Sequence, residues 1–262
     1  MTVLATRLDF ALPLIEHENV THKVGEILSS PCFAALDRVS ARRKDRWTKH
    51  AKPAPNVIAE YLLDSSYDAI SMDNRDGEEV LGSAEIESGV RNRDGVPATT
   101  RFFAYVVLPV EAGGWREALQ GVLDLATALD TGAGMIAEEP SYAFGQRFAL
   151  GGSKPKPRPG LSELRMYERR ARDWKRELVS EKLAGVEWGT FLGADHLKVM
   201  NAEALRRTNV FERVLELAPN LVFLQLTADP ADDLSGGFEA KRIEARRALG
   251  PLMMEIGDVS VD

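Results

Sequence analysis

Few residues of this 262-residue chain have the types and spacing that chemistry requires. The four histidines are His17, His22, His50 and His196. His17 and His22 lie five positions apart, whereas a helical zinc motif needs two histidines four positions apart with a general base between them. Exposed loop positions explain this pair better than a metal site does, so we predict no bound metal.

A nucleophilic or acid–base site is also poorly supported. Cys32 is the single cysteine, and its apolar surroundings are typical of a small buried hydrophobic residue. Asp195 and His196 could be grouped with it, but no surrounding motif supports a catalytic set. Glu138 and Glu139 are adjacent, so on a strand they point to opposite faces. Because the sequence also lacks a nucleophile elbow, a P-loop and a dinucleotide-binding motif, we predict a protein that is not an enzyme and binds no cofactor.

One segment of six residues combines two glycines with two large aromatic residues: Trp188-Gly189-Thr190-Phe191-Leu192-Gly193. A helix-like run follows from Ala194 to Met200. Because glycine adopts backbone angles that other residues avoid, the segment predicts a tight strand-to-helix junction with the aromatic side chains buried in the core. It contains no nucleophile and no metal-binding side chain, so its predicted role is packing.

Charge is segregated along the chain, whose net charge is −7. Residues 38–52 carry seven basic side chains against one aspartate, and residues 154–182 carry ten against five acidic ones. Residues 64–87 have the opposite character, because eight carboxylates accompany only Arg75. These carboxylates belong to Asp64, Asp68, Asp73, Asp76, Glu78, Glu79, Glu85 and Glu87. Such runs are often solvated faces, but an acidic surface also attracts a basic partner and repels nucleic acid.

The basic segment 154–176 interleaves cations with Tyr167 and Trp174, as a helix that follows a phosphate backbone does. Acidic residues within this segment lie at spacings that allow pairing along a helix, and the whole chain is acidic. Both observations favour an ordinary solvated helix. We therefore expect no direct binding of nucleic acid.

The hydrophobic pattern predicts helices and strands interspersed along the chain. Strands or extended segments are expected at residues 8–12, 69–72, 84–86, 99–110, 134–137, 142–150, 213–217, 221–227 and 252–256. Helices are expected at residues 20–39, with a break or restart at Pro31, and at residues 115–129, 161–178, 194–207 and 238–249. Turn dipeptides such as Asp76-Gly77 join the middle strands. This order favours an α+β fold, with mostly antiparallel sheet or sheets packed against helices.

Particular residues set the positions of several elements. Pro13 either ends the first strand or places it at a sheet edge. The basic residues 38–52 are expected to continue the first helix or to cap its end. Residues 102–108 are apolar on both faces, which predicts a central strand. The proline-rich residues 151–160 form a long surface loop or join two lobes, and we expect a single domain over residues 1–262.

The composition is ordinary for a globular protein, with 44% hydrophobic and 28% charged residues. No apolar run is long enough to cross a membrane, and the N-terminus lacks the pattern of a secretory signal. The single cysteine excludes an internal disulfide framework. We expect a cytoplasmic protein without a membrane partner.

The segment Trp188–Gly193, followed by His196 and Leu197, resembles the Trp-x-x-Phe-Leu-Gly-x-x-Leu motif of type VI secretion immunity proteins. These are small antitoxins encoded beside effectors of contact-dependent bacterial killing. The further elements that match in order are residues 102–109, the helix 115–129, Gly132-Ala-Gly134, and the helix with Arg246, Arg247 and Leu249 before Pro251. The resemblance covers roughly residues 100–255, and residues 64–87 and 153–159 have no counterpart in it.

The resemblance implies an immunity protein that binds a cognate effector toxin directly and protects the producing cell. Similar family members neutralise nucleases of the restriction-endonuclease-like class, so the implied partner is a nuclease, specifically a DNase, with a basic cleft. Residues 64–87 could occupy or shield that cleft. Binding away from the catalytic site is equally open, with Arg170, Arg172 and Trp174 as anchors. A homodimer is compatible with both modes.

Two other classes of function stay open. A nucleic-acid-binding regulator predicts DNA binding that weakens steeply with salt. A hydrolase with a dispersed site predicts a deep pocket that holds two or more titratable groups with shifted pKa values. The immunity-protein hypothesis predicts a tight complex with a toxin and no turnover of any substrate.

Overall fold

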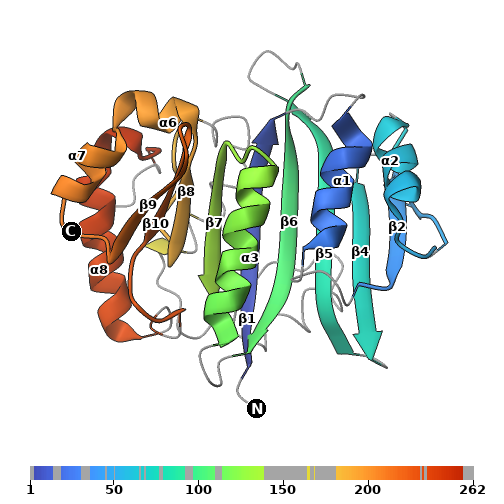
Figure 1. Cartoon of the computed structure of the whole chain (residues 1–262), viewed down its shortest axis with the longest axis horizontal. Coiled ribbons are helices and arrows are strands. Elements are labelled where there is room, and N and C mark those ends of the chain that lie inside the picture. Colours follow the sequence, from blue (N-terminus) through green and yellow to red (C-terminus); the bar gives the residue numbers. More distant parts are fainter. Residues whose placement is uncertain are drawn as a thin grey trace.

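Antiparallel strand pairing runs across the whole computed structural model (Figure 1). The structure describes residues 3–13, 19–30, 36–44, 46–49, 51–64, 66–67, 69–76, 79–91, 97–109, 114–138, 164–165, 168, 181–230, 232 and 235–255. The described strands are β1 (Val3–Pro13), β2 (Arg38–Arg43), β3 (Arg46–Trp47), β4 (Ala69–Asp76), β5 (Glu79–Arg91), β6 (Pro97–Pro109), β7 (Ala133–Glu138), β8 (Gly189–Leu192), β9 (Arg213–Ala218) and β10 (Leu221–Gln225). They form one sheet in the order β3-β2-β4-β5-β6-β1-β7-β8-β10-β9.

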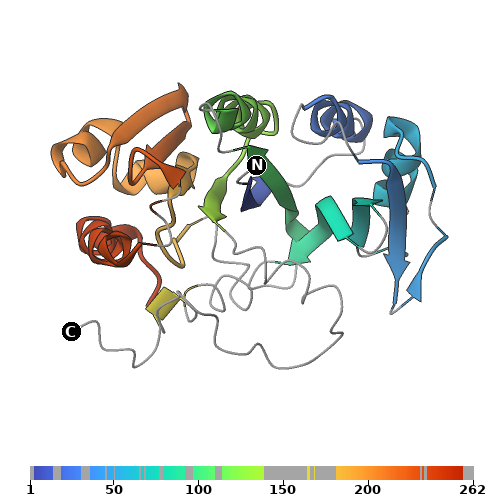
Figure 2. The same ribbon diagram turned by 90° about the horizontal axis from the view of Figure 1, so that it is seen from below.

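Helices pack against this sheet, so the predicted α+β class is confirmed. The described helices are α1 (Val20–Ser29), α2 (Pro55–Leu63), α3 (Gly114–Ala128), α6 (Ala194–Val199), α7 (Ala202–Arg207) and α8 (Gly236–Ala248), with a 3-10 turn at Gly250–Leu252. Figure 2 shows α1 and α3 on the same side of the sheet, with α8 toward the opposite side. The helices α1 and α3 therefore lie side by side, although strands β2 to β6 lie between them in the sequence.

β1 lies in the middle of the sheet, between β6 and β7. Leu8, Phe10 and Leu12 are buried, which explains why the alternation in this segment was a clear strand signal. Pro13 is the last residue of the strand, and it opposes Thr99 of β6, whereas the pairing with β7 stops at Ala11. Pro13 thus ends the strand, as one of the two alternatives predicted, and the edge position is wrong.

The basic residues after α1 form strands, and the prediction that they continue or cap that helix is wrong. Val39 and Ala41 of β2 are buried and lie opposite Met72 and Ile70 of β4. This apolar cross-strand pairing outweighs the helical spacing, because a half-buried strand needs apolar residues only at alternate positions. The cations of β2 and β3 therefore lie at an edge of the sheet, where charged side chains discourage pairing with another chain.

Most other predicted elements agree with the structure, and one does not. β6 contains the expected central strand, and α3, β7, β9, β10 and α8 lie within a few residues of their predicted bounds. The expected strand at 252–256 is wrong, because the 3-10 turn occupies its start and Met253 forms only an isolated bridge with Leu183. The linker 151–160 and the extended segment 142–150 lie outside the described residues.

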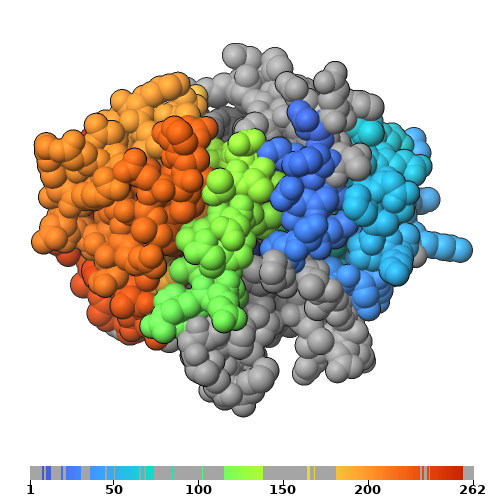
Figure 3. Space-filling view, in the orientation of Figure 1, coloured from blue at the N-terminus to red at the C-terminus, as the bar shows by residue number. Residues whose placement is uncertain are grey.

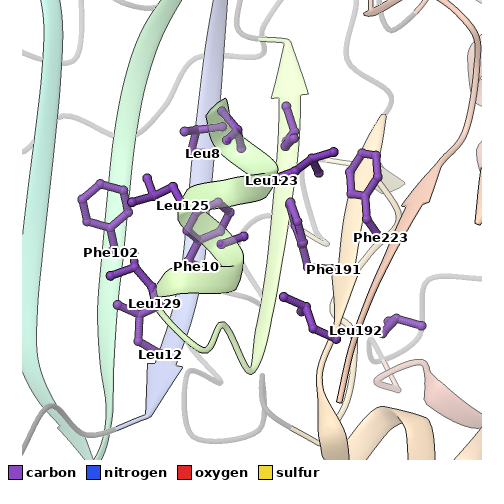
Figure 4. Packing of buried hydrophobic residues seen from close by; sticks show 14 of the residues in the cluster. Leu8, Phe10, Leu12, Phe102, Leu123, Leu125, Leu129, Phe191, Leu192 and Phe223 are labelled. Carbon is purple, nitrogen blue, oxygen red and sulfur yellow. The ribbon is translucent and has the colours of Figure 1, made fainter. Parts of the chain in front are cut away.

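The hydrophobic core continues from the N-terminal strands to the C-terminal strands. The ring of Phe10 lies 6.1 Å from that of Phe102 and 5.2 Å from that of Phe191, measured between centroids. Figure 4 shows Leu125 of α3, and Leu129 directly after this helix, beside Phe10 and Phe102. Because one core connects both halves, α3 is held rigidly over the centre of the sheet.

Candidate partner-binding site

A groove runs between α1 and α3 on the face shown in Figure 3. Its volume is about 460 Å³. The residues of its wall that matter below are Glu26, Ser30, Glu117, Gln120, Gly121 and Asp124. We call this feature the acidic groove, because three of these side chains are carboxylates.

Both helices are amphipathic. Their apolar faces are buried, and polar residues of both helices line the groove between them. Val24 and Ile27 of α1 and Val122 and Leu125 of α3 are buried against the sheet. At one end, the Lys23 ammonium donates to the carboxylate of Asp130 at 2.7 Å and to the carbonyl of Ala128. This contact ties α1 to the C-terminal end of α3, and the groove opens along the remaining length of the two helices.

The three carboxylates of the acidic groove face no strong cation in the described part of the chain. Glu26 has only His22 nearby, at 3.7 Å, and that imidazole is a cation only when protonated. Asp124 accepts a hydrogen bond from the neutral amide of Gln120 at 2.8 Å. Glu117 lies in the first turn of α3, where the helix dipole favours a negative charge. The groove is therefore a concentrated acceptor surface.

A buried hydroxyl accompanies these carboxylates. Ser30 caps the C-terminal end of α1 and lines the groove, and it is only 7% exposed. Its Oγ has no hydrogen-bond partner in the structure as described. Most buried polar atoms are paired, so an unpaired hydroxyl beside a groove is a position where a ligand group could supply the missing bond.

The predicted acidic segment 64–87 lies elsewhere, on the end of α2 and on strands β4 and β5. Asp64 is exposed, and Ser66 lowers the pKa of its carboxyl while donating a backbone N–H to it at 2.9 Å. Asp73 is buried and pairs with Arg38 of β2, which argues against direct contact with a partner. The remaining members divide into Asp76, Glu79, Glu85 and Glu87 on the two strands, and Asp68 and Glu78 outside the described residues.

The predicted basic anchors Arg170, Arg172 and Trp174 also lie outside the described residues. Two neighbours in the same segment, Arg165 and Glu168, are described, and both are buried. The Arg165 Nε donates to Glu187 at 2.9 Å, and the carboxylate of Glu168 accepts from Arg242 and from Arg246, the latter at 2.8 Å. Together with four buried residues, the partly buried Arg246 forms what we call the buried charge cluster: Arg165, Glu168, Glu187, Arg242 and Arg246.

The buried charge cluster joins Glu168 to α8. Arg242 also donates from Nε to the carbonyl of Val186 at 2.7 Å, so its guanidinium is bonded on several sides. Burial raises the pKa of the Glu168 carboxyl, although Arg242 and Arg246 oppose that shift. Sequence spacing predicted that Glu168 pairs along its own helix, whereas its partners come from α8, far away in sequence. The role of this cluster is structural.

The segment Trp188–Gly193 forms the predicted junction, since β8 leads directly into α6. Trp188 is buried, its indole N–H donates to the carbonyl of Thr227 at 3.1 Å, and its ring meets that of Trp115 edge-on at 5.8 Å. Gly193 has ordinary extended backbone angles, so the predicted reason for a glycine there is wrong. A Cβ atom at this position would overlap the backbone of Gly132, and this close approach requires the glycine.

His196 follows this junction and is fully buried. Burial lowers the pKa of its imidazole to about 4. Cys32, the other half of the hypothetical nucleophilic pair, lies outside the described residues. A neutral, enclosed imidazole is typical of a packed core position.

Two further findings concern metals and membranes. No group of three or more described histidine, cysteine, aspartate or glutamate residues is placed to hold a metal ion. Among the described helices, none is both long enough and apolar enough to cross a bilayer.

The acidic groove was missed by reasoning from the sequence. The usable signal was present, because Glu117, Gln120 and Asp124 share one stripe of a predicted helix. These residues form a groove only because Glu26 and Ser30 lie opposite them. No sequence pattern shows that α1 packs next to α3.

Comparisons with known proteins place the fold. No family model and no curated protein matches the sequence. The fold is similar to that of the Pseudomonas aeruginosa T6SS protein PA0821, with a TM-score of 0.60 and 13% identity, covering 99% of this chain and 77% of that chain. A chain in the crystal structure of the toxic C-terminal tip of CdiA from Pseudomonas aeruginosa in complex with immune protein is also similar, with a TM-score of 0.32 and 11% identity, covering 54% of this chain and 90% of that chain. The first similarity shows a common fold, and the second is too distant to carry an argument.

Proposed function

We propose that this chain is an immunity protein that binds and neutralises a cognate type VI secretion effector toxin by direct protein–protein association. The observation that supports this proposal most is the similarity in fold to a T6SS protein, which extends over 99% of the chain. The Trp188–Gly193 motif supports the same assignment, since it builds the junction between β8 and α6 that completes the C-terminal half.

The surface of the molecule is consistent with this function. The acidic groove presents three carboxylates to a partner, and the described residues of its wall include no catalytic constellation. A nuclease toxin with a basic DNA-binding cleft is the partner class that an acidic chain attracts most strongly, and charge attraction speeds such encounters. On this proposal, the protein acts in the cytoplasm of the producing cell.

The test is protection in bacteria. The toxin gene that neighbours the gene for this chain is expressed from one plasmid, and this chain is expressed from a second plasmid. We expect normal growth only when both are present, and a stable complex between the purified proteins. A matched experiment with an unrelated nuclease toxin should give no protection. Loss of growth in the presence of both cognate proteins, together with no complex by size-exclusion chromatography, would refute the proposal.

A DNA-binding assay distinguishes this proposal from a nucleic-acid-binding regulator. A regulator that binds DNA would retain a duplex in a gel-shift assay at low salt and release it steeply as salt rises. An immunity protein should leave the duplex unbound. When it is mixed with an active nuclease toxin, it should prevent the toxin from digesting the duplex.

A further inference from the structure

We infer that the acidic groove between α1 and α3 is the contact site for an arginine-bearing segment of the toxin. This inference rests on the proposed function and names the surface and the chemistry that carry it out. It replaces residues 64–87 as the principal contact.

The first argument is the unpaired charge. Glu26, Glu117 and Asp124 come from two different helices and converge on one groove of about 460 Å³. Two described cations on these helices make other contacts: Lys23 pairs with Asp130, and the Arg116 guanidinium lies over the Trp115 ring at 5.0 Å from its centroid. The carboxylates therefore keep most of their capacity to accept hydrogen bonds from a partner.

The second argument is the Ser30 hydroxyl, which is independent of the charge. It is nine-tenths buried at the wall of the groove and has no hydrogen-bond partner among the described residues. An unsatisfied buried hydroxyl is unfavourable in the free protein, and a ligand donor or acceptor that reaches it removes that cost. A hydroxyl beside carboxylates suits a group with several donors.

The chemistry of the occupant follows from these acceptors. A phosphate or nucleic acid would be repelled by three carboxylates. An arginine guanidinium presents five N–H donors in a planar fork, which matches carboxylates better than a point charge does. Nuclease toxins that carry a basic cleft display such side chains on a protein surface. The groove is therefore suited to hold basic residues that would otherwise contact DNA.

The experiment measures the affinity of the full chain for the purified toxin, with its catalytic residues inactivated, by isothermal titration calorimetry. The test variant combines Glu26→Gln, Glu117→Gln and Asp124→Asn. The matched control combines Asp195→Asn, Glu203→Gln and Glu216→Gln, which removes the same charge from exposed carboxylates that already pair with cations of their own. We expect the test variant to bind about 30-fold more weakly or worse, and the control to stay within about threefold of the wild type.

Each outcome is decisive. If the test variant binds like the wild type, or if both variants weaken equally, the groove is not the contact site, although the proposed function stands. If the wild-type chain itself does not bind the toxin, the proposed function fails and this inference fails with it. Circular dichroism establishes that both variants are folded.

Ser30→Ala gives a second readout that a structural role would not produce. The hydroxyl makes no hydrogen bond within the described structure, so its removal should leave the melting temperature unchanged or slightly higher. Toxin binding should weaken about fivefold, because the partner loses one hydrogen bond. Unchanged affinity for the toxin would show that the occupant does not reach Ser30.

Discussion

In the acidic groove, carboxylates lie at the surface and face no strong cation from the opposite helix. In the buried charge cluster, Glu168 and Glu187 are enclosed, and each accepts hydrogen bonds from arginine. The side-chain types are the same, but the surroundings differ. Removing a charge from water is costly unless it is paired, so each charge inside the cluster depends on its partner. The unpaired carboxylates outside cost little and remain available to a partner.

The largest predicted effect concerns the buried side of this comparison. Glu168→Ala removes the buried carboxylate that accepts from the Arg242 guanidinium, and among the described residues Arg242 then keeps its bonds to the part-exposed Glu239 and to the carbonyl of Val186. We expect the free energy of unfolding to fall by about 3–5 kcal/mol, because a buried charge that loses its partner is strongly destabilising. Urea denaturation followed by circular dichroism measures this change.

Glu117→Ala is the matched control on the groove side. Its carboxylate is exposed, so we expect the free energy of unfolding to change by no more than about 0.5 kcal/mol. Equal losses for the two variants would contradict the distinction between a structural cluster and an available groove.

The second prediction concerns pH and the buried His196. Its folded pKa of about 4 lies below the ordinary value of 6.5. As the pH falls below 6.5, the unfolded chain binds a proton and the folded chain does not, so stability is lost between pH 6.5 and about 4 and is complete above pH 6.5. This shift corresponds to a loss of about 3 kcal/mol.

His196→Leu isolates that contribution, because other groups titrate in both proteins. We expect the wild type to lose about 3 kcal/mol more than the variant between pH 7 and pH 4, measured by urea unfolding at each pH. Parallel pH profiles for the two proteins would show that the imidazole is not held neutral.

Local sequence patterns predicted the elements in which the apolar residues follow a clear period or composition. The strand around Phe102, the helix after Trp115 and the junction at Trp188–Gly193 were all predicted, since burial in each follows from apolar period or composition. The residues 38–43 were predicted as helix and form β2, because Val39 and Ala41 gain their burial from β4, which is remote in sequence.

The candidate site was beyond the reach of the sequence for the same reason. Glu26 and Asp124 lie on helices separated by several strands, and only the packing of α1 beside α3 brings them to one groove. The predicted acidic segment 64–87 is continuous in sequence, yet the sheet buries Asp73 within it against Arg38. Net charge along a segment therefore does not show which of its carboxylates are exposed.

The third prediction compares packing density at two glycines. Gly193→Ala places a methyl group against the backbone of Gly132, which cannot rotate away, so we expect a loss of about 2–3 kcal/mol. Gly25→Ala on α1 meets open space and should gain up to about 1 kcal/mol from helix propensity. Thermal unfolding of the two variants should therefore move the melting temperature in opposite directions, and a shift of the same sign would contradict the difference in packing.

The smallest predicted effect concerns the contact of Lys23 with Asp130 and Ala128, which joins α1 to the end of α3 beside the groove. Lys23→Met keeps the apolar stem but removes the ammonium that joins α1 to Asp130 and to the carbonyl of Ala128, so we expect a loss of about 1 kcal/mol in the free energy of unfolding. Lys198→Met removes an exposed pair with Asp195 within α6 and should cost less than about 0.5 kcal/mol. If the spacing of α1 and α3 matters for the partner, Lys23→Met should also weaken toxin binding while Lys198→Met does not. Because neither lysine is a proposed contact, a loss of affinity confined to Lys23→Met would trace binding to the geometry of the groove and not to the charge of the surface as a whole.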